Sequence, residues 1–357
     1  MKSATSVLHV VESFGGGVAS ALHQYTLATP GLTHNLLRTE REGDYIDSGE
    51  TAGFDEVRSL NKNALRAIMQ IRRTVSDLNP DVIHAHSSLA GLYVRLGIRS
   101  SPRRPIVYTP HGYASERADV PAITAKAYRL IESVLSINTG KYAACSPREA
   151  SLSRFGRSSV SVVHVPNVAN LGQLSAAPSK KPDVGAKFQV VGTGRLAPAR
   201  DPYFFRDVAR IVRRVNPAIE FVWVGGGDKR YRAALNEVGV TVTGWLPRNE
   251  ALEAFAQADL HLHPSAWDGF PMVLLEANAL RIPSIVRDIV AFAEVPEVVK
   301  YGSTERVAED VLDAFANRSK LGTALRIWDS FLSENTQQVQ SRRLLEAYGL
   351  PDGQVCS

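Results

Sequence analysis

Short apolar segments alternate with longer amphipathic segments along almost the whole chain of 357 residues. The apolar segments are rich in β-branched residues and end at turn-forming residues, which is typical of buried strands. This alternation predicts an α/β protein with parallel sheets covered on both faces. The strands predicted in the first half are Val7–Val11, Asn35–Leu37, Val82–Ala85, Ile106–Thr109, Tyr142–Ala144 and Val160–Val165, with helices near 18–28, 63–78, 88–98, 122–137 and 147–155.

The alternation stops at residues 172–186, where prolines, a glycine and two lysines accompany few apolar residues, as in a linker. It resumes with strands Phe188–Thr193, Phe221–Val224, Val240–Thr243, Leu260–Leu262 and Ser284–Val286, helices near 203–215, 229–238, 249–257, 272–280 and 304–316, and a helical tail over 318–348. We therefore expect two Rossmann-like, doubly wound domains. They cover 1–172 and 187–330, with the linker at 173–186 and a helical segment at 331–357.

The composition is that of a globular protein, with 44% hydrophobic and 22% charged residues and a net charge of +5. The whole excess lies in residues 1–172, which hold 19 basic and 14 acidic side chains. Such a half suits an anionic partner, such as a lipid surface, a phospholipid-like acceptor or nucleic acid, although an ordinary surface bias explains it as well. Because basic stretches interleaved with aromatic residues are absent, we expect no nucleic-acid partner.

The two cysteines, Cys145 and Cys356, lack a CxxC spacing, which argues against a disulfide scaffold and suits a reducing compartment. The first apolar run is too short for a signal peptide and contains His9. No apolar run approaches the length of a membrane span. These features predict a cytoplasmic protein whose membrane contact is at most peripheral.

Ligands of doubly wound sheets collect where the strands end, so motifs that follow predicted strands are the candidates. Gly15, Gly16 and Gly17 lie between the first strand and a helix expected to begin near Val18. Glycines let the backbone approach a ligand, and a helix amino terminus favours an anion. A tight strand-to-helix turn without a ligand remains the alternative.

Histidines follow two further strands of the first half. His111, in the segment TPHGYASE, lies on a turn where its ring could donate or accept a hydrogen bond. His84 and His86 alternate at a strand end and therefore share one face. No third ligand has a suitable spacing, so we expect no metal site.

In the second half, Gly194, Arg195 and Arg200 follow the strand Phe188–Thr193 in the segment GTGRLAPARDP. Two cations beside a strand end suit a diphosphate leaving group, because negative charge builds up on it as the bond breaks. Surface arginines are the alternative. Gly225 begins the segment GGGD after the next strand, where a tight turn and a nucleotide pocket both stay open.

The segment HPSAWDGFPMVLLEANA carries two acids, with Asp268 before the helix expected at 272–280 and Glu276 inside it. Pro271 suits the first helical turn, and unbonded amides around Met272 to Leu274 could face a diphosphate. A carboxylate among apolar residues costs free energy unless it gains partners, which the hydroxyls of a sugar or ribose would supply. An amphipathic helix with an incidental acid is the alternative.

This last segment resembles the E-G-F-x7-E segment of retaining, family-4-type glycosyltransferases with the GT-B fold (glycosyl transferases group 1). Further segments follow that family's order: HGY at 111–113, CSPREA at 145–150, VPNV at 165–168, VGGGD at 224–228 and GWLPRNE at 244–250. The resemblance implies two α/β domains that face each other across a cleft. It also implies that helices after about residue 330 cross back to the first domain.

The resemblance implies roles for single residues. The glycine loop would approach the donor sugar and phosphate, His111 would contact the transferred sugar, and Glu276 would hold the ribose. The implied catalytic residues are His111, Arg195, Arg200 and Asp268, and the implied donor-binding residues are Gly15, Gly16, Gly17, Gly194, Gly225, Gly269, Phe270, Pro271, Met272, Val273, Leu274 and Glu276. Asp268 replaces a glutamate of the family, Arg200 replaces a lysine, and Arg281 with residues 288–290 replaces a glycine-containing stretch of the base pocket.

These observations lead us to expect retaining transfer of a sugar from a UDP-hexose or UDP-N-acetylhexosamine to a hydroxyl acceptor, such as a lipid-linked or polysaccharide precursor of a cell-surface glycan. Since no DxD sequence occurs, we expect neither a metal nor another cofactor. A basic stretch and the helix at 122–137 suggest peripheral contact with an anionic inner leaflet. The stretch comprises Arg95, Arg99, Arg103 and Arg104.

Two alternatives remain. A nucleotide-sugar epimerase of the same fold would turn over its substrate without an acceptor, whereas a phosphorylase would need a lysine context for pyridoxal phosphate that we do not find. The basic first half also leaves a non-enzymatic protein that binds nucleotides or nucleic acid.

Overall fold

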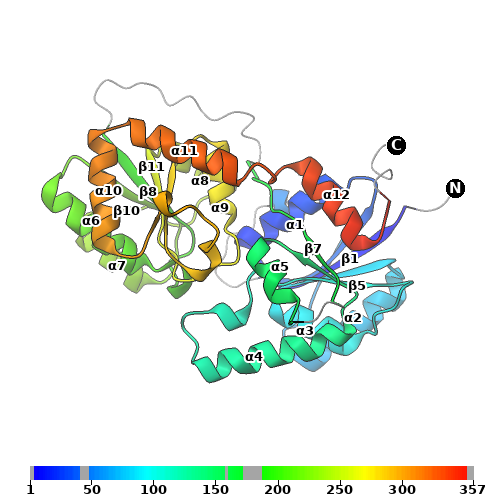
Figure 1. The fold of residues 1–357 in the computed structure, drawn as a ribbon. Coiled ribbons are helices and arrows are strands. Elements are labelled where there is room, and N and C mark those ends of the chain that lie inside the picture. The colour runs from blue at the N-terminus through cyan, green and yellow to red at the C-terminus, as the bar shows by residue number, and fades with distance from the viewer. Residues whose placement is uncertain (1–3, 41–47, 157–159, 172–186, 352–357) are drawn as a thin grey trace. The chain divides into compact units, whose positions relative to one another are not determined.

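The computed structural model describes residues 4–40, 48–156, 160–171 and 187–351 (Figure 1). The chain divides into two compact units, one formed by Met1–Val168 with Asn335–Ser357 and the other by Ala169–Glu334. The linker expected at 173–186 lies outside the described residues. None of the described helices is long and apolar enough to span a membrane.

The first unit contains a parallel sheet of seven strands in the order β3-β2-β1-β4-β5-β6-β7. Its strands are β1 (Ser6–Phe14), β2 (Thr33–Glu40), β3 (Glu56–Ser59), β4 (Val82–His86), β5 (Ile106–Thr109), β6 (Lys141–Ala144) and β7 (Val162–His164). Its α-helices are α1 (Gly16–Ala28), α2 (Ala64–Leu78), α3 (Ser88–Gly97), α4 (Ala122–Leu135), α5 (Pro147–Ser153) and α12 (Gln337–Tyr348).

Both faces of the central strands are buried, which explains why these strands read as continuous apolar runs. Residues such as Leu8 and Ile83 pack under α2 and α3. Val7 and Val82 pack on the other face with residues of α1 and α12. Figure 1 shows these two helices next to each other. The helix α12 therefore completes the core of the first sheet, although it lies at the far end of the sequence.

The second unit repeats this design with a parallel sheet of six strands in the order β10-β9-β8-β11-β12-β13. Its strands are β8 (Gln189–Thr193), β9 (Glu220–Val224), β10 (Thr241–Val242), β11 (Leu260–His263), β12 (Ser284–Arg287) and β13 (Lys300–Tyr301). Its α-helices are α6 (Pro202–Val215), α7 (Lys229–Glu237), α8 (Arg248–Ala256), α9 (Met272–Ala279), α10 (Thr304–Ala316) and α11 (Ser319–Phe331). The side chains of α6, α7 and α10 share one core, and those of α8 and α9 share another.

Polar side chains determine where several helices begin. Asn63, Ser146, Asp228 and Thr336 each accept a hydrogen bond from a backbone amide of the helix that follows. A cap of this kind contributes about 1 kcal/mol. The N-cap role expected for Asp228 is among those found.

The observed elements differ from the expected ones at a few positions. The strand β3 was not expected, because its exposure alternates along an edge of the sheet and leaves no apolar run. The strand β13 was missed as well, because it comprises two residues. The helix α1 begins at Gly16 and not near Val18, so two of the three glycines form its first turn.

The expected basic stretch is only partly a surface feature. Arg99 and Arg103 are exposed, but Arg95 is 3% exposed and lies 4.0 Å above the ring of Tyr108. Its guanidinium donates to both carboxylate oxygens of Glu132 on α4, at 2.9 and 3.2 Å. Arg95 thus fastens α3 to α4 inside the unit and does not face an anionic surface.

We predict that Glu132→Gln lowers the free energy of unfolding by about 3 kcal/mol, because the guanidinium of Arg95 keeps its charge in a buried site without a compensating anion. Urea denaturation measures the loss. The matched control is Glu346→Gln, which breaks a pair with Arg343 whose side chains are 41% and 48% exposed. That change should cost less than about 1 kcal/mol. Equal losses in both variants would contradict the assignment.

Candidate functional site

The candidate residues of each unit gather at the carboxyl edge of its sheet. In both sheets the chain direction switches beside the first strand, between β1 and β4 and between β8 and β11, and ligands of such sheets bind at that point. The candidates follow the strands nearest to these two points: Gly15 after β1, His111 after β5, Gly194 after β8, Gly225 after β9 and Asp268 after β11.

The glycine loop of the first unit leads directly into α1. Gly15 is the N-cap of this helix and supplies no side-chain hydrogen bond, and Gly16 and Gly17 are exposed in the first turn. Gly16 has a φ of 53°, which a residue with a side chain adopts only under strain, although no other atom lies within 4 Å of its Cβ position. The loop thus presents backbone amides to solvent at a helix amino terminus, as an anion site requires.

His111 is held in a strained conformation. Its φ is 53°, in the left-handed region that residues with side chains rarely occupy. The next residue, Gly112, donates its amide to Oε2 of Glu149 at 2.7 Å, and the other carboxylate oxygen accepts the amide of Cys145 at 3.0 Å. Glu149 lies in the first turn of α5, whose N-cap is Ser146. The turn that carries His111 is therefore tied to α5 through a single buried carboxylate.

The buried histidines of the first unit form a larger group than the sequence suggests. A third histidine, His9 on β1, lies beside His84 and His86 of β4, and possible ligand atoms of the three lie within 4.8 Å of one another. The spacing along the sequence indicated no third ligand, whereas pairing between strands brings His9 to this face. Nδ1 of His86 lies 3.1 Å from Nε2 of His111, so the group extends to the candidate site. Burial lowers the pKa of each of these four rings, that of His111 to about 4, so they are neutral at pH 7.

In the second unit, Arg200 and Asp268 form an ion pair beside the end of β11. Arg200 also donates to the hydroxyl of Ser265 at 3.1 Å, and Asp268 accepts the amide of Gly269 at 2.8 Å. Burial alone would raise the pKa of Asp268, but the charge of Arg200 and the contact with His263, whose Nε2 lies 3.5 Å away, outweigh burial and lower it to about 2. Asp268 is thus ionised and offsets one of the two cations expected for the diphosphate.

The loops of Gly194 and Gly225 lie against each other. Gly194 donates its amide to the carbonyl of Val224 at 2.9 Å, and a Cβ atom on Gly225 would lie 2.2 Å from the carbonyl oxygen of Gly194. Gly225 is therefore required by contact between the two loops, whatever binds there. Arg195 is half-buried on the same loop as Gly194.

Glu276 has a partner within the chain, which the sequence did not reveal. Its side chain, on α9, is buried and forms an ion pair with Arg248 of α8. Arg248 also donates to the carbonyl of Asn170 at 2.5 Å. The segment GWLPRNE, which contains Arg248, carries part of the family resemblance, but nothing in its spacing links Arg248 to Glu276.

The residues around the start of α9 also differ from expectation. Pro271 is the N-cap and not part of the first turn, and its carbonyl accepts the amide of Leu274 at 3.2 Å. Of the amides expected to be unbonded, that of Leu274 is therefore engaged. Phe270 packs against Phe331 of α11, and Met272 is buried. Val273 is half-buried beside them.

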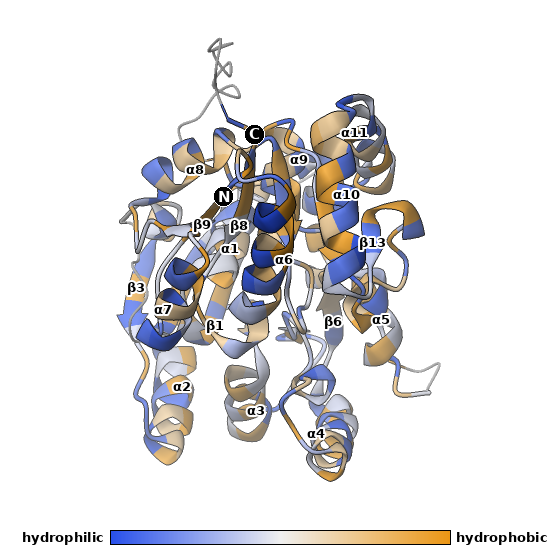
Figure 2. Cartoon of the chain, turned by 90° about the vertical axis from the view of Figure 1, so that its left-hand side faces the viewer, coloured by the Kyte–Doolittle hydropathy of each residue, from blue (hydrophilic) through white to orange (hydrophobic). Residues whose placement is uncertain are grey.

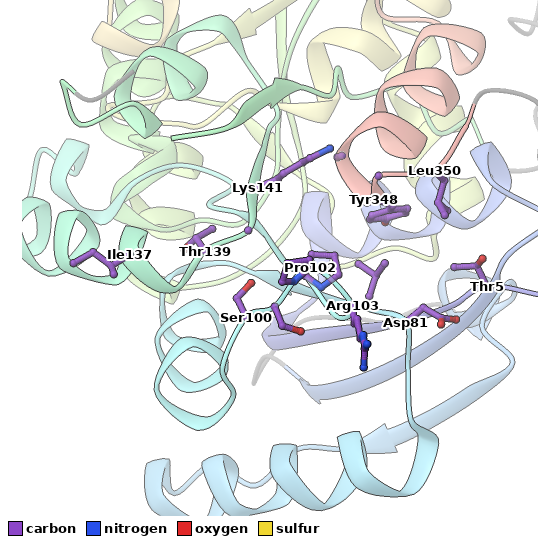
Figure 3. Close-up of a pocket in the computed structure, with 16 residues that line it drawn as sticks. Thr5, Asp81, Ser100, Pro102, Arg103, Ile137, Thr139, Lys141, Tyr348 and Leu350 are labelled. Carbon is purple, nitrogen blue, oxygen red and sulfur yellow. The ribbon is translucent and has the colours of Figure 1, made fainter. Parts of the chain in front are cut away.

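A pocket of about 610 Å³ lies elsewhere in the first unit, at the opposite edge of the sheet (Figure 3). Thr5, Asp81 and Lys141 line it near the amino ends of β1, β4 and β6, together with Tyr348 and Leu350 at the end of α12. It contains none of the residues assigned to the donor. Because ligands of such sheets bind at the carboxyl edge, this pocket is not the candidate site.

We predict that Glu149 gives the protein a specific pH dependence of stability. Burial raises the pKa of Glu149 from 4.5 to about 6, although the amides of Cys145 and Gly112 act in the opposite direction. Because the folded state keeps this proton to higher pH than the unfolded chain, the free energy of unfolding should fall by about 2 kcal/mol in total as the pH rises from well below 4.5 to well above 6.

Glu149→Gln should remove this fall, whereas the exposed control Glu346→Gln should retain it. Urea denaturation at several pH values measures both. If wild type and Glu149→Gln keep a constant difference across this range, the perturbed carboxyl is assigned to the wrong residue.

Comparison with known protein families identifies both units. Residues 8–168 match the glycosyl transferase 4-like domain, and residues 186–320 match glycosyl transferases group 1. A relative from Escherichia coli, named UDP-Gal:alpha-D-GlcNAc-diphosphoundecaprenol alpha-1,3-galactosyltransferase, is 26% identical over 69% of this chain and 68% of its own length. An uncharacterised protein in the cps region of Klebsiella pneumoniae is 24% identical over 84% of each chain.

Solved structures agree on the fold. Sucrose-phosphate synthase from Thermosynechococcus elongatus superposes with a TM-score of 0.76 at 15% identity, over 97% of this chain and 98% of its own. HepE from Anabaena in complex with UDP superposes with a TM-score of 0.73 at 17% identity, over 97% and 100%. The expected fold class and family are both confirmed: the chain belongs to the group 1, family-4-type glycosyltransferases with the GT-B fold.

Proposed function

We propose that this glycosyltransferase moves a hexose from a UDP-hexose to a hydroxyl of a lipid-linked sugar, with retention of configuration, during synthesis of a cell-surface glycan. The observation that carries the proposal is the group of charged residues at the carboxyl edge of the second sheet, where Arg195, Arg200, Asp268 and Glu276 follow adjacent strands. The name of the Escherichia coli relative, a galactosyltransferase that acts from UDP-Gal on a diphosphoundecaprenol-linked sugar, favours this donor and this class of acceptor.

In the proposed reaction, the second unit binds the donor. Arg195 and the amides at the start of α9 offset the charge that builds up on the leaving diphosphate. Arg200 contributes less to this, because the carboxylate of Asp268 already balances its charge. Glu276, held by Arg248, accepts hydrogen bonds from the ribose hydroxyls. No DxD sequence supplies metal ligands, so we assign the neutralisation to side chains.

Asp268 is proposed to position the sugar and not to attack it. Its low pKa keeps it ionised, but Arg200 and the amide of Gly269 occupy its oxygens and reduce its nucleophilicity. A hydroxyl of the sugar can still donate to the remaining lone pairs. The acceptor hydroxyl then attacks from the face that the diphosphate leaves, and the departing phosphate takes its proton.

A peripheral membrane contact is proposed for α4, because this helix exposes an apolar stripe. Figure 2 shows apolar and polar residues mixed along α4. The stripe has helical spacing, and its large side chains are Ile123, Leu130, Ile131 and Val134 of α4 with Ile137 of the 3₁₀ turn that follows, from 47% to 80% exposed. Ile137 and the exposed Arg103 line the same pocket, so cations lie close to one end of the stripe (Figure 3). Apolar residues beside cations suit a bilayer with anionic headgroups.

We predict that the purified protein transfers hexose from UDP-hexose to a diphospholipid-linked sugar, and that Arg195→Ala lowers kcat/KM on the order of 10²-fold through loss of transition-state charge stabilisation. A radiolabelled transfer assay with UDP-, GDP- and ADP-sugars measures both. The control is Arg306→Ala, on the surface of α10, where the side chain is 72% exposed. Full activity of Arg195→Ala would overturn the assigned site. Conversion of the UDP-sugar without any acceptor would favour an epimerase.

We predict that the double variant Ile123→Asp/Leu130→Asp binds vesicles containing phosphatidylglycerol about tenfold more weakly than wild type, because charge replaces two apolar side chains of the stripe. Vesicle sedimentation at low and high salt measures the change. Val215→Asp, on α6, is the matched control, since this valine is 67% exposed in the second unit. Absence of wild-type binding at low salt would contradict the membrane contact.

A further inference from the structure

Three buried histidines and the half-buried His111 are joined head to tail by hydrogen bonds. Nε2 of His34 lies 3.1 Å from the carbonyl oxygen of Thr29, and Nδ1 of His34 lies 3.0 Å from Nε2 of His9. Nδ1 of His9 lies 3.0 Å from Nε2 of His86, and Nδ1 of His86 lies 3.1 Å from Nε2 of His111. The chain thus connects β2, β1 and β4 with the turn after β5.

The far end of this chain determines the direction of its hydrogen bonds. A carbonyl oxygen can only accept, so Nε2 of His34 carries a proton and donates it to Thr29. The hydroxyl of Thr29, 3.2 Å from the same nitrogen, is also an acceptor there, because it donates its own proton to the carbonyl of Tyr25 at 2.8 Å. Both oxygens of Thr29 therefore require the Nε2-protonated tautomer of His34.

Each neutral imidazole has one protonated and one unprotonated nitrogen. The tautomer of His34 therefore determines the tautomer of each following histidine in the hydrogen-bonded series. His34 accepts through Nδ1, which requires Nε2 of His9 to donate. His9 then accepts from Nε2 of His86, and His86 accepts from Nε2 of His111. Burial lowers the pKa of all four rings, which keeps them neutral at pH 7.

We propose that His34, His9 and His86 are positioning residues that fix His111 with its proton on Nε2, so that its Nδ1 serves as a hydrogen-bond acceptor toward the ligand. Nδ1 of His111 has no hydrogen-bond partner among the described residues. We assign a hydroxyl group of the transferred sugar as the donor to Nδ1 of His111. This assignment of the donor rests on the proposed function. If both tautomers of His111 were available, its Nδ1 could either accept or donate a hydrogen bond. It would then distinguish less well between ligands that present a donor and ligands that present an acceptor.

The neighbouring His84 does not belong to this series of hydrogen-bonded histidines, and both of its ring nitrogens form hydrogen bonds of their own. Its Nε2 lies 2.8 Å from the hydroxyl of Thr109, which donates its own proton to the carbonyl of Ala143 at 2.7 Å. His84 therefore donates through Nε2 and accepts from the hydroxyl of Tyr348, 3.0 Å from its Nδ1. A metal ion bound by His9, His84 and His86 would have to break these bonds, so hydrogen bonding and metal binding exclude each other in this group.

The tautomers can be measured directly on the ligand-free protein. Long-range ¹H–¹⁵N correlation spectra of protein labelled with ¹⁵N-histidine distinguish the two neutral tautomers of each ring. We expect His34, His9, His86 and His111 all in the Nε2-protonated form at pH 7. An Nδ1-protonated His111 would overturn the proposal, and so would zinc-dependent shifts of His9, His84 and His86 with one equivalent of added Zn²⁺. Neither result depends on glycosyl transfer.

Substitution of His34, the residue of the hydrogen-bonded series farthest from His111, tests whether the series sets the tautomer of His111 or only stabilises the fold. We call this transmitted effect the relay. His34→Leu removes the acceptor for His9, so the signals of His111 should show both tautomers. His34→Gln supplies one acceptor and one donor at the same place and should restore the single tautomer. His84→Leu, equally buried but outside the chain, is the control and should leave His111 unchanged. An unchanged His111 in folded His34→Leu would overturn the relay.

Kinetics then test the link to the sugar. His34→Leu should lower kcat/KM about fivefold, the effect of losing one neutral hydrogen bond in part of the molecules, and His34→Gln should restore it. If His34→Leu shows mixed tautomers but full activity, the sugar contact is wrong although the relay stands. If wild type transfers no sugar, the proposed function fails, while the spectra still decide the relay.

Discussion

The parallel direction of the strands in both sheets is the constraint on which the rest of this structure depends. Because parallel strands end at one edge, the loops after β1, β4 and β5 meet in the first unit, and those after β8, β9 and β11 meet in the second. The same direction places His9 beside His84 on paired strands. A hydrogen-bonded sheet thus brings together side chains that lie far apart along the chain.

Charged and polar side chains near the strand ends become partly or fully buried in this arrangement, because helices cover the ends of the strands. Each acid discussed above has a partner within the chain: Arg95 for Glu132, Arg200 for Asp268, Arg248 for Glu276, and two backbone amides for Glu149. The charge that remains for a ligand is therefore smaller than a count of arginines implies. Matched pairs also hold their members in fixed positions, which suits groups that must meet a substrate in one geometry.

The sequence was sufficient for the fold, since apolar runs such as Val82–Ala85 coincide with buried strands, and turn residues mark their ends. It failed where periodicity carries little information, as in the alternating edge strand β3 and the two-residue strand β13. Within the candidate site, the sequence identified residues that follow strands but not their partners. Arg248, Glu149 and His9 act through contacts between elements, and no local spacing encodes such contacts.

The discontinuity of the first unit has a consequence for synthesis of the protein. Its sheet is complete by β7, yet Leu344, Leu345 and Tyr348 of α12 fill the face under which the histidines lie. During translation the whole second unit emerges before these residues do. Most of the amino-terminal unit is therefore synthesised first, but its core is completed only when α12 has been synthesised. Before that point the unit exposes an apolar surface with the histidines beneath it, which favours aggregation of the nascent chain.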